Sequence, residues 1–327
     1  MAPAAARFYG DPTAQLETVA ITGTNGKTTT AFLLRSLLGA DGRRSGLMGT
    51  VKSVVGGVEH DVIHFAVAIF TNLTQDHLDF HPTMEDYFQA KRRLFTQLRP
   101  GVAVINVDDS YGRRLADEIE GAVTFGLESP DAAYRAVDLQ TGLSGSTFSV
   151  ATPDGPLPVR SPLTGRLNVL NVLGALAAAR SLGISAPVCT TAIEGAGQVP
   201  GRFQSVDEGQ PFAVLVDYAH TPDSLENVLA AARSLSSGRL HLVFGAGGDR
   251  DRRKRPQMGA IARRLADRVI VTSDNPRSED PEAIIAEILR APRVRRWAEG
   301  PIDDVGVARE VLRGLSATTP TKPGGAR

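Results

Sequence analysis

The sequence predicts an α/β protein of two domains, each built on a mainly parallel sheet. Three observations carry this prediction. Short apolar, β-branched runs alternate with helical stretches along most of the 327 residues. A glycine-rich stretch at 195–201 interrupts the alternation, which restarts after it. A chain of this length also accommodates two domains of about 150 residues each.

In the first half, the pattern begins with a strand at 18–22 and a helix at 29–38. Two short strands at 49–55 and 58–63 are expected to form a hairpin about a Gly-Gly pair. The elements predicted next are a strand at 65–70, a helix at 83–98, a strand at 102–107, antiparallel strands within 133–160 and a helix at 168–183.

The second half repeats the alternation, which favours a doubly wound, Rossmann-like domain. Its predicted elements are strands at 212–217, 240–244 and 268–272 and helices at 222–235, 255–265 and 281–289. We therefore expect one domain at 18–197 and another at 198–313. Residues 1–17 are interpreted as a lead-in, and the polar residues 314–327 as a disordered tail.

The composition argues against several classes of protein. Lys and Arg total 36 and Asp and Glu total 36, so the zero net charge disfavours a nucleic-acid-binding protein. Cys189 is the one cysteine, which excludes an intrachain disulfide and a cysteine-cluster metal site. No apolar run reaches about 18 residues, and the start has no apolar signal segment. We expect a cytoplasmic protein that does not span a membrane.

A glycine loop, Gly23-Thr24-Asn25-Gly26-Lys27-Thr28, joins the first strand to the first helix and resembles a P-loop. Its glycines let backbone N–H groups turn toward phosphate, and the helix N-terminus adds positive charge. Lys27 can reach phosphate oxygens, and the Thr28 hydroxyl can bind Mg²⁺. Ile21 stands where the strict pattern has a glycine, so the loop is a variant. The alternative is a helix-capping turn with Lys27 in solvent.

Residues 72–81 follow an apolar strand and hold one asparagine, two aspartates and two histidines. Open α/β sheets bind ligands at the carboxyl ends of their strands, so this segment is a candidate site. The equally simple alternative is a polar turn that caps the helix at 83–98. Lys91 lies on that helix, and from its neighbours alone it is interpreted as a surface lysine.

Together these features resemble the Mur ligase family, the ATP-dependent amino-acid ligases of peptidoglycan synthesis. The motifs that match in the second half are Gly201-Arg202-Phe203, Asp217-Tyr-Ala-His220-Thr-Pro-Asp223, Gly245-Ala-Gly-Gly-Asp249-Arg250-Asp251, Lys254-Arg-Pro256-Gln-Met-Gly259 and Asp274-Asn-Pro-Arg277. The last motif is associated with members that add meso-diaminopimelate rather than lysine. The resemblance covers about residues 8–290 and implies a P-loop central domain, here with an incomplete parallel sheet, and a C-terminal Rossmann-like domain.

The resemblance also implies roles for individual residues, with ATP and Mg²⁺ as cofactors. The residues implied in ATP binding are Gly23, Thr24, Asn25, Gly26, Lys27, Thr28, Thr29, Asn168, Arg202 and Asp217. Lys27, His77 and Lys91 are the implied catalytic residues. Thr28, His77 and Lys91, the last as an N-carbamate, are the implied metal ligands. The implied diaminopimelate pocket consists of Arg250, Asp274, Asn275 and Arg277, whose charges suit a zwitterionic amino acid.

Several of these positions have a purely structural alternative. Asn168 could cap its helix. Residues 274–277 could be a proline turn, and the basic residues at 250–255 could form a solvated face. Arg253 stands where the family has a glycine, and a side chain there is expected to disturb a turn that needs positive φ.

The implied substrates are small molecules, a UDP-N-acetylmuramoyl dipeptide and meso-diaminopimelate, with no nucleic-acid or membrane partner and a monomeric state. Three family segments have no counterpart here. They are the N-terminal uridine-nucleotide domain, an internal segment near 61–64 that carries a metal-binding glutamate, and a Gly-Lys-Gly-His-Glu segment near the C-terminus. The alternatives are a truncated, catalytically impaired nucleotide-binding module and a folate polyglutamylating ligase. The Asp-Asn-Pro-Arg box disfavours the second.

Overall fold

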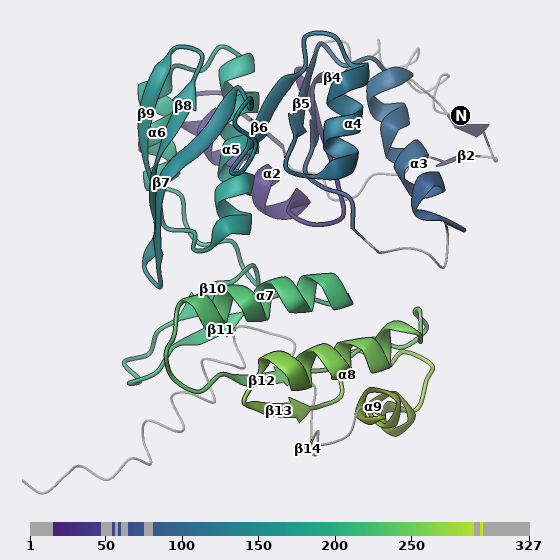
Figure 1. Cartoon of the computed structure of the whole chain (residues 1–327). Helices are drawn as coiled ribbons and strands as arrows, with labels where there is room; N and C mark the ends of the chain where they lie inside the picture. The colour runs from purple at the N-terminus through teal and green to yellow at the C-terminus, as the bar shows by residue number, and fades with distance from the viewer. Residues whose placement is uncertain are drawn as a thin grey trace, which may run out of the picture. The chain divides into compact units, whose positions relative to one another are not determined.

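The computed structural model describes residues 16–46, 54–55, 58–59, 65–74, 81–290 and 295–296. The chain divides into two compact units, 1–197 and 198–327, and each is described by itself (Figure 1). The division falls inside the glycine-rich stretch 195–201. The predictions made for residues 1–15, 61–64 and 314–327 lie outside the described residues.

A seven-stranded sheet organises unit 1, in the order β1-β4-β5-β6-β7-β8-β9. The first five strands in this order are parallel, and β8 and β9 continue the sheet as an antiparallel meander. The strands of unit 1 are β1 (Thr18–Thr22), β2 (Val54–Val55), β3 (Val58–Glu59), β4 (Phe65–Phe70), β5 (Val102–Asn106), β6 (Val123–Gly126), β7 (Tyr134–Gly142), β8 (Gly145–Thr152) and β9 (Gly155–Ser161). β2 and β3 form a separate antiparallel pair, in the region of the predicted hairpin.

The helices of unit 1 are α2 (Lys27–Ala40), α3 (Met84–Thr96), α4 (Ser110–Glu118), α5 (Arg166–Ser181) and α6 (Ala186–Glu194). They cover both faces of the sheet. In keeping with this, β4, which lies between β1 and β5, is an unbroken apolar run that is buried from residue 67 to residue 70. Ala68 and Phe70 pack in one core with Phe88 of α3 and Leu115 of α4. Helix α5 packs against β4, β5 and β6.

Unit 2 is a smaller α/β arrangement of parallel strands and helices (Figure 1). Its elements are β10 (Gln204–Val206), β11 (Val214–Val216), α7 (Pro222–Ser234), β12 (His241–Phe244), α8 (Lys254–Leu265), β13 (Arg268–Val271), α9 (Pro281–Leu289) and β14 (Arg295–Arg296). β12, β13 and β14 form a parallel sheet, and β10 pairs antiparallel with β11. The three helices and the sheet share an apolar core that includes Leu229, Met258, Val271 and Ile288.

The parallel sheets and helices of both units confirm the predicted α/β fold class. Among the described helices, none combines the length and the apolar character that crossing a bilayer requires.

Candidate functional site

The glycine loop at 23–26 connects β1 to α2 and lies directly against two other segments. Gly23 has φ 151° and Gly26 has φ 86°, in the region that favours glycine. A Cβ on Gly23 would lie 1.8 Å from Thr71 Oγ1, and a Cβ on Gly26 would lie 2.3 Å from Asn171 Oδ1. Both glycines are therefore required by the close approach of the β4 end and α5.

The segment after β4 braces this loop by hydrogen bonds. The backbone N–H of Asn25 donates to Asn72 Oδ1 at 2.8 Å, and Asn72 Nδ2 donates back to Asn25 O at 3.1 Å. The Thr71 hydroxyl donates to Asn25 O at 2.6 Å, and Thr24 N–H donates to Asn72 O at 2.9 Å. The sequence predicts a candidate ligand site at residues 72–81. In the described part of that segment, Asn72 is hydrogen-bonded to the glycine loop.

The start of α2 offers an anion-binding helix terminus. Gly26 is its N-cap, no side chain of the described residues caps it, and its first turn holds no acidic residue. Thr28 is exposed, whereas Thr29 is buried. Lys27 Nζ donates to Gly23 O at 2.7 Å and to Thr24 O at 2.8 Å, so its ammonium group folds over the loop. A positive helix end with a lysine beside it fits a phosphate group.

Lys91 reaches the same loop from α3. Its Nζ donates to Gly23 O at 3.2 Å and to Thr22 Oγ1 at 3.5 Å, and it lies 4.5 Å from the Tyr87 ring centroid. The ammonium groups of Lys27 and Lys91 thus both bind the Gly23 carbonyl. The interpretation of Lys91 as a surface lysine is wrong, because its side chain is half-buried against the loop.

The metal site is the least complete part of the arrangement. His77 lies outside the described residues, so its predicted role as a ligand has no geometry here. The described residues contain no group of three His, Cys, Asp or Glu side chains that could hold a metal ion. Thr28 presents an exposed hydroxyl at the helix start, an oxygen donor of the kind Mg²⁺ prefers. Lys91 fits a cation only as the predicted carbamate, because an ammonium group repels one.

Two aspartates after β5 are engaged in structural contacts. Asp109 accepts from Leu73 N–H and from Gly112 N–H, both at 2.9 Å. Burial alone would raise the pKa of Asp108, but hydrogen bonds from Leu127 and Ser129 hold that pKa below its ordinary value. Asp108 therefore stays ionised as the anchor of the turn after β6.

Asn168 lies in the first turn of α5 and is linked, through Asn171, to Thr30 in the first turn of α2. Its Nδ2 donates to Thr164 O at 2.9 Å, and its Oδ1 accepts from Asn171 Nδ2 at 3.2 Å. Asn171 Oδ1 in turn accepts from the Thr30 hydroxyl at 3.4 Å. The N-cap of α5 is Gly165, so the capping alternative for Asn168 is wrong.

The predicted nucleotide residues of unit 2 gather around Tyr218. Asp217 Oδ2 accepts from Phe203 N–H at 2.7 Å, and burial raises the pKa of this carboxyl above its ordinary value. The Arg202 guanidinium lies 4.7 Å from the Tyr218 ring centroid, and the His220 ring meets that ring edge-on at 5.1 Å. Tyr218 is 63% exposed, so the cluster presents an aromatic face beside a cation.

The predicted amino-acid residues lie on two loops, 245–250 after β12 and 272–279 after β13. These strands are parallel neighbours, so the loops leave the same edge of the sheet. Gly248 N–H donates to Asn275 O at 2.8 Å, and Arg277 Nη1 donates to Gly248 O. A Cβ on Gly248 would lie 1.8 Å from Pro276 O. The structure therefore brings together the loops that carry Arg250, Asp274, Asn275 and Arg277.

The basic run at 250–255 is not a uniform solvated face. Arg255 is fully buried and bonds Glu279 and Glu287. The hydrogen bond with Arg255 is the main reason that the pKa of Glu279 falls to about 2. Arg253 has φ −65°, so the expected disturbance of a positive-φ turn at this position is wrong. The positive φ angles belong to Asp249 and Arg277.

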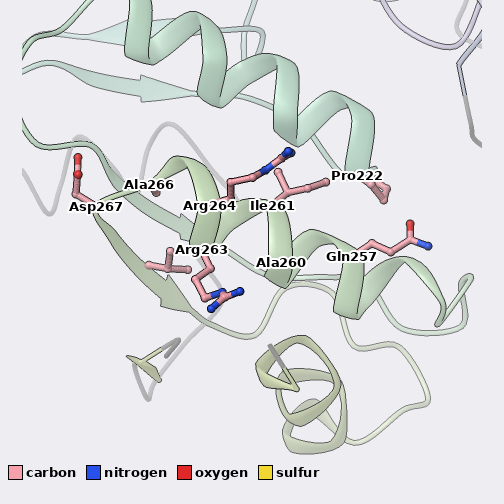
Figure 2. A pocket seen from close by; sticks show the side chains of 9 residues that line it. Pro222, Gln257, Ala260, Ile261, Arg263, Arg264, Ala266 and Asp267 are labelled. Atoms are coloured by element: carbon pink, nitrogen blue, oxygen red, sulfur yellow. The ribbon is translucent and has the colours of Figure 1, made fainter. Parts of the chain in front are cut away.

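Figure 2 shows a surface hollow of unit 2 that holds none of the predicted site residues. Its lining includes Pro222 at the start of α7, Gln257, Ile261 and Arg264 of α8, and Asp267. Arg264 is paired with Glu226, and Asp267 with Arg233.

Two known families match the chain in consecutive parts. Residues 53–179 match the Mur ligase middle domain, and residues 201–313 match the glutamate ligase domain of Mur ligases. The UDP-N-acetylmuramoyl-L-alanyl-D-glutamate–2,6-diaminopimelate ligase of Geobacter metallireducens is 44% identical over 338 residues, with 88% of this chain and 66% of the relative covered. The chain thus spans about two thirds of that relative's length.

Solved structures show the same likeness. A structure titled as a UDP-N-acetylmuramoyl-L-alanyl-D-glutamate–2,6-diaminopimelate ligase has a TM-score of 0.61 at 32% identity, covering 93% of this chain and 71% of that one. The folylpolyglutamate synthase of Mycobacterium tuberculosis reaches a TM-score of 0.74, covering 96% of this chain and 88% of that one. At 19% identity, this second likeness shows a shared fold alone.

Proposed function

The chain belongs to the Mur ligase family, and we propose that it is an ATP-dependent ligase joining meso-diaminopimelate to UDP-N-acetylmuramoyl-L-alanyl-D-glutamate. One observation carries the proposal. Residues 274–277 are hydrogen-bonded to loop 245–250 in a chain 44% identical to a relative named for that reaction. The predicted ligand residues on these loops supply one carboxylate, Asp274, and two guanidinium groups, Arg250 and Arg277, which suit the ammonium and carboxylate of diaminopimelate.

ATP is the proposed energy source, with its phosphates at residues 23–28. The uncapped start of α2 and the Lys27 ammonium group support this placement. Thr28, His77 and carbamylated Lys91 are proposed to hold Mg²⁺, which neutralises charge on the phosphate oxygens when bound. Asn168, Arg202 and Asp217 are the other proposed nucleotide contacts.

The proposed reaction has two chemical steps. A carboxylate oxygen of the dipeptide attacks the γ-phosphorus of ATP, forming an acyl phosphate and releasing ADP. The amine of diaminopimelate then loses a proton and attacks the acyl carbon, and the tetrahedral intermediate expels phosphate to leave an amide. Lys27 stabilises charge on the transferring phosphoryl group. Arg250, Asp274, Asn275 and Arg277 hold the amino acid in place.

One observation favours a second candidate, a nucleotide-binding module of the same ancestry with impaired catalysis. The alignment with the Geobacter relative has 338 positions but uses 88% of 327 residues, about 288, which leaves about 50 positions unmatched. Such a shortfall is expected if the internal segment near 61–64 is missing. That segment supplies a metal-binding glutamate in the family, so its loss would weaken turnover more than nucleotide binding.

Phosphate release from ATP tests the proposal against this candidate. Purified protein would be mixed with ATP, Mg²⁺ and bicarbonate, with and without the UDP-dipeptide and meso-diaminopimelate. The ligase predicts steady release that requires both substrates. Release without them would identify an ATP hydrolase, and no release from a folded protein that binds ADP would favour the nucleotide-binding module.

We also propose a cytoplasmic location, since ATP is supplied there, and a monomeric state with only small-molecule partners. Light scattering on the purified chain tests the monomeric state.

A further inference from the structure

We propose that Arg255 is a positioning residue that couples the two loops of the amino-acid site without touching the substrate. The proposal rests on the proposed function for the identity of the ligand. The coupling itself stands on contacts within unit 2.

One buried guanidinium group joins three parts of the unit. Arg255 comes from α8 and its side chain has no exposed surface. Its Nη1 donates to Glu279 Oε2 at 2.9 Å and to Glu287 Oε2 of α9 at 2.8 Å. Its Nη2 donates to Glu279 Oε1 at 2.7 Å, and Gly247 O accepts from the same nitrogen at 3.4 Å. Arg255 therefore holds loop 272–279 by a two-point contact while it also reaches loop 245–250.

Glu279 connects Arg255 to residues that neighbour the proposed ligand contacts Arg250 and Arg277. Its Oε1 also accepts from Asp249 N–H at 2.6 Å. The Asp249 carboxylate accepts from the Ser278 hydroxyl at 2.7 Å and from Ser278 N–H at 3.2 Å. Asp249 precedes Arg250, and Ser278 follows Arg277. Each of these arginines is thus one residue from a position that the Arg255–Glu279 pair holds.

The backbone at Asp249 and at Arg277 is in an uncommon conformation. Asp249 has φ 52° and Arg277 has φ 50°, which residues other than glycine rarely adopt. Such angles persist only where surrounding contacts fix them. Contacts of this kind are the hydrogen bonds that Asp249 N–H donates to Glu279, that the Ser278 hydroxyl donates to the Asp249 carboxylate, and that Arg277 donates to Gly248 O.

A contribution to folding stability does not by itself explain why Arg255 is buried between Glu279 and Glu287. Arg255 Nε is buried and has no hydrogen-bond partner among the residues that the structure describes, and a buried ion pair is a weak source of folding free energy. A planar guanidinium is, however, the group that can hold one carboxylate at two points while reaching a second. The geometry that Arg255 imposes on the loops accounts for its position better than its contribution to folding does.

The first test compares Arg255→Lys with Arg264→Lys. Arg264 lies on the same helix and pairs with Glu226 at 2.6 Å, but its side chain is 59% exposed. Lysine keeps the charge and loses the two-point contact. Hydrogen exchange in Arg255→Lys should quicken in residues 245–250 and 272–279 together, while exchange in α8 stays at the wild-type rate. Arg264→Lys should match the wild type throughout.

The second measurement is calorimetric titration of the same proteins with meso-diaminopimelate and with ADP. Arg255→Lys should weaken diaminopimelate binding by roughly tenfold, the scale on which residues that hold a ligand-binding group in place act. ADP binding should stay within about twofold of the wild type, because no predicted nucleotide residue lies on these loops. Glu279→Gln weakens the same ion pair from the loop side. It should likewise weaken diaminopimelate binding and leave ADP binding unchanged, and it replaces Arg255→Lys in the test if that variant does not fold.

Wild-type exchange rates in both loops of folded Arg255→Lys would overturn the proposal. Faster exchange that spreads through α8 and α9 would also overturn it, because that result describes a merely structural arginine. A wild-type protein that binds no diaminopimelate would overturn the proposed function instead, and the exchange result would still decide the coupling.

Discussion

Gly26 is one of two positions, with Gly23, at which the glycine loop leaves no room for a side chain. Its φ of 86° disfavours any residue with a side chain, and a Cβ there would lie only 2.3 Å from Asn171 Oδ1. We expect Gly26→Ala to lower the free energy of unfolding by about 2–3 kcal/mol, from backbone strain plus the clash. Chemical denaturation followed by circular dichroism measures this loss.

Gly42→Ala is the matched control for this substitution. Gly42 has φ 76°, but no atom of the described part of the chain lies within 4 Å of its hypothetical Cβ. It should cost about 1 kcal/mol from the left-handed backbone alone. Equal losses for the two variants would contradict the close approach of α5 to the loop.

The lowered pKa of Glu279 leads us to expect that the stability of the fold depends on pH in the acid range. Its ion pair with Arg255 lowers the pKa of this carboxyl from 4.5 to about 2 in the folded protein. A depressed carboxyl pKa stabilises the fold above pH 4.5, and this stabilisation is lost as pH falls toward 2. Glu279→Gln should therefore show a smaller decline in urea midpoint between about pH 5 and pH 3 than the wild type. Parallel declines would show that the pair contributes nothing to folding.

Local spacing in the sequence placed Lys27 on the glycine loop, but it gave no sign of contacts between residues that are distant in the chain. Lys27 lies on the loop as its spacing predicts. The contact of Thr30 with Asn171 joins residues 141 positions apart, and that of Arg255 with Glu287 spans 32. No local pattern marks such pairs. The glutamates at 279 and 287 were the available signal that part of the basic run is buried.

Helix α7 shows how an element's start is fixed by its own sequence. The Thr221 hydroxyl accepts from Ser224 N–H at 3.2 Å, and Ser224 Oγ accepts from Thr221 N–H at 3.0 Å, a reciprocal capping box. Thr221→Ala should cost about 1 kcal/mol of unfolding free energy. Ser234→Ala, in the last turn of the same helix, should change it by less than about 0.5 kcal/mol. A similar loss in both would argue against the cap as the cause.

The long elements were predictable, and five short ones were missed: α4, β6, α6, β10 and β14. Helix α4 is nine residues long and contains a glycine and two arginines, so its apolar face is too short to stand out. β6 has four residues and ends in Gly126, and only its place beside β5 makes it a strand. β10 is a strand because β11 pairs with it. These elements depend on tertiary contacts that the local sequence does not encode.

At the scale of the molecule, the rate at which a reagent labels Cys189 measures how often unit 1 unfolds. It is the one cysteine, its side chain is buried, and burial raises the pKa of its thiol to about 11. A thiol reagent should therefore label the native protein at least about 10³-fold more slowly than the denatured protein. Gly26→Ala should raise the native labelling rate by the same factor by which it raises the equilibrium constant of unfolding. Rapid labelling of the native wild type would contradict the burial of Cys189, on α6, inside unit 1.

The measurement that tests the ligase most directly is detection of its product by mass spectrometry. The protein would receive ATP, Mg²⁺, bicarbonate, the UDP-linked dipeptide and equal amounts of meso-diaminopimelate and L-lysine. A UDP-linked tripeptide that contains diaminopimelate, and that Lys27→Ala does not form, is the predicted result. No tripeptide from a folded protein that binds ADP, or a product that contains lysine, would contradict the proposed function.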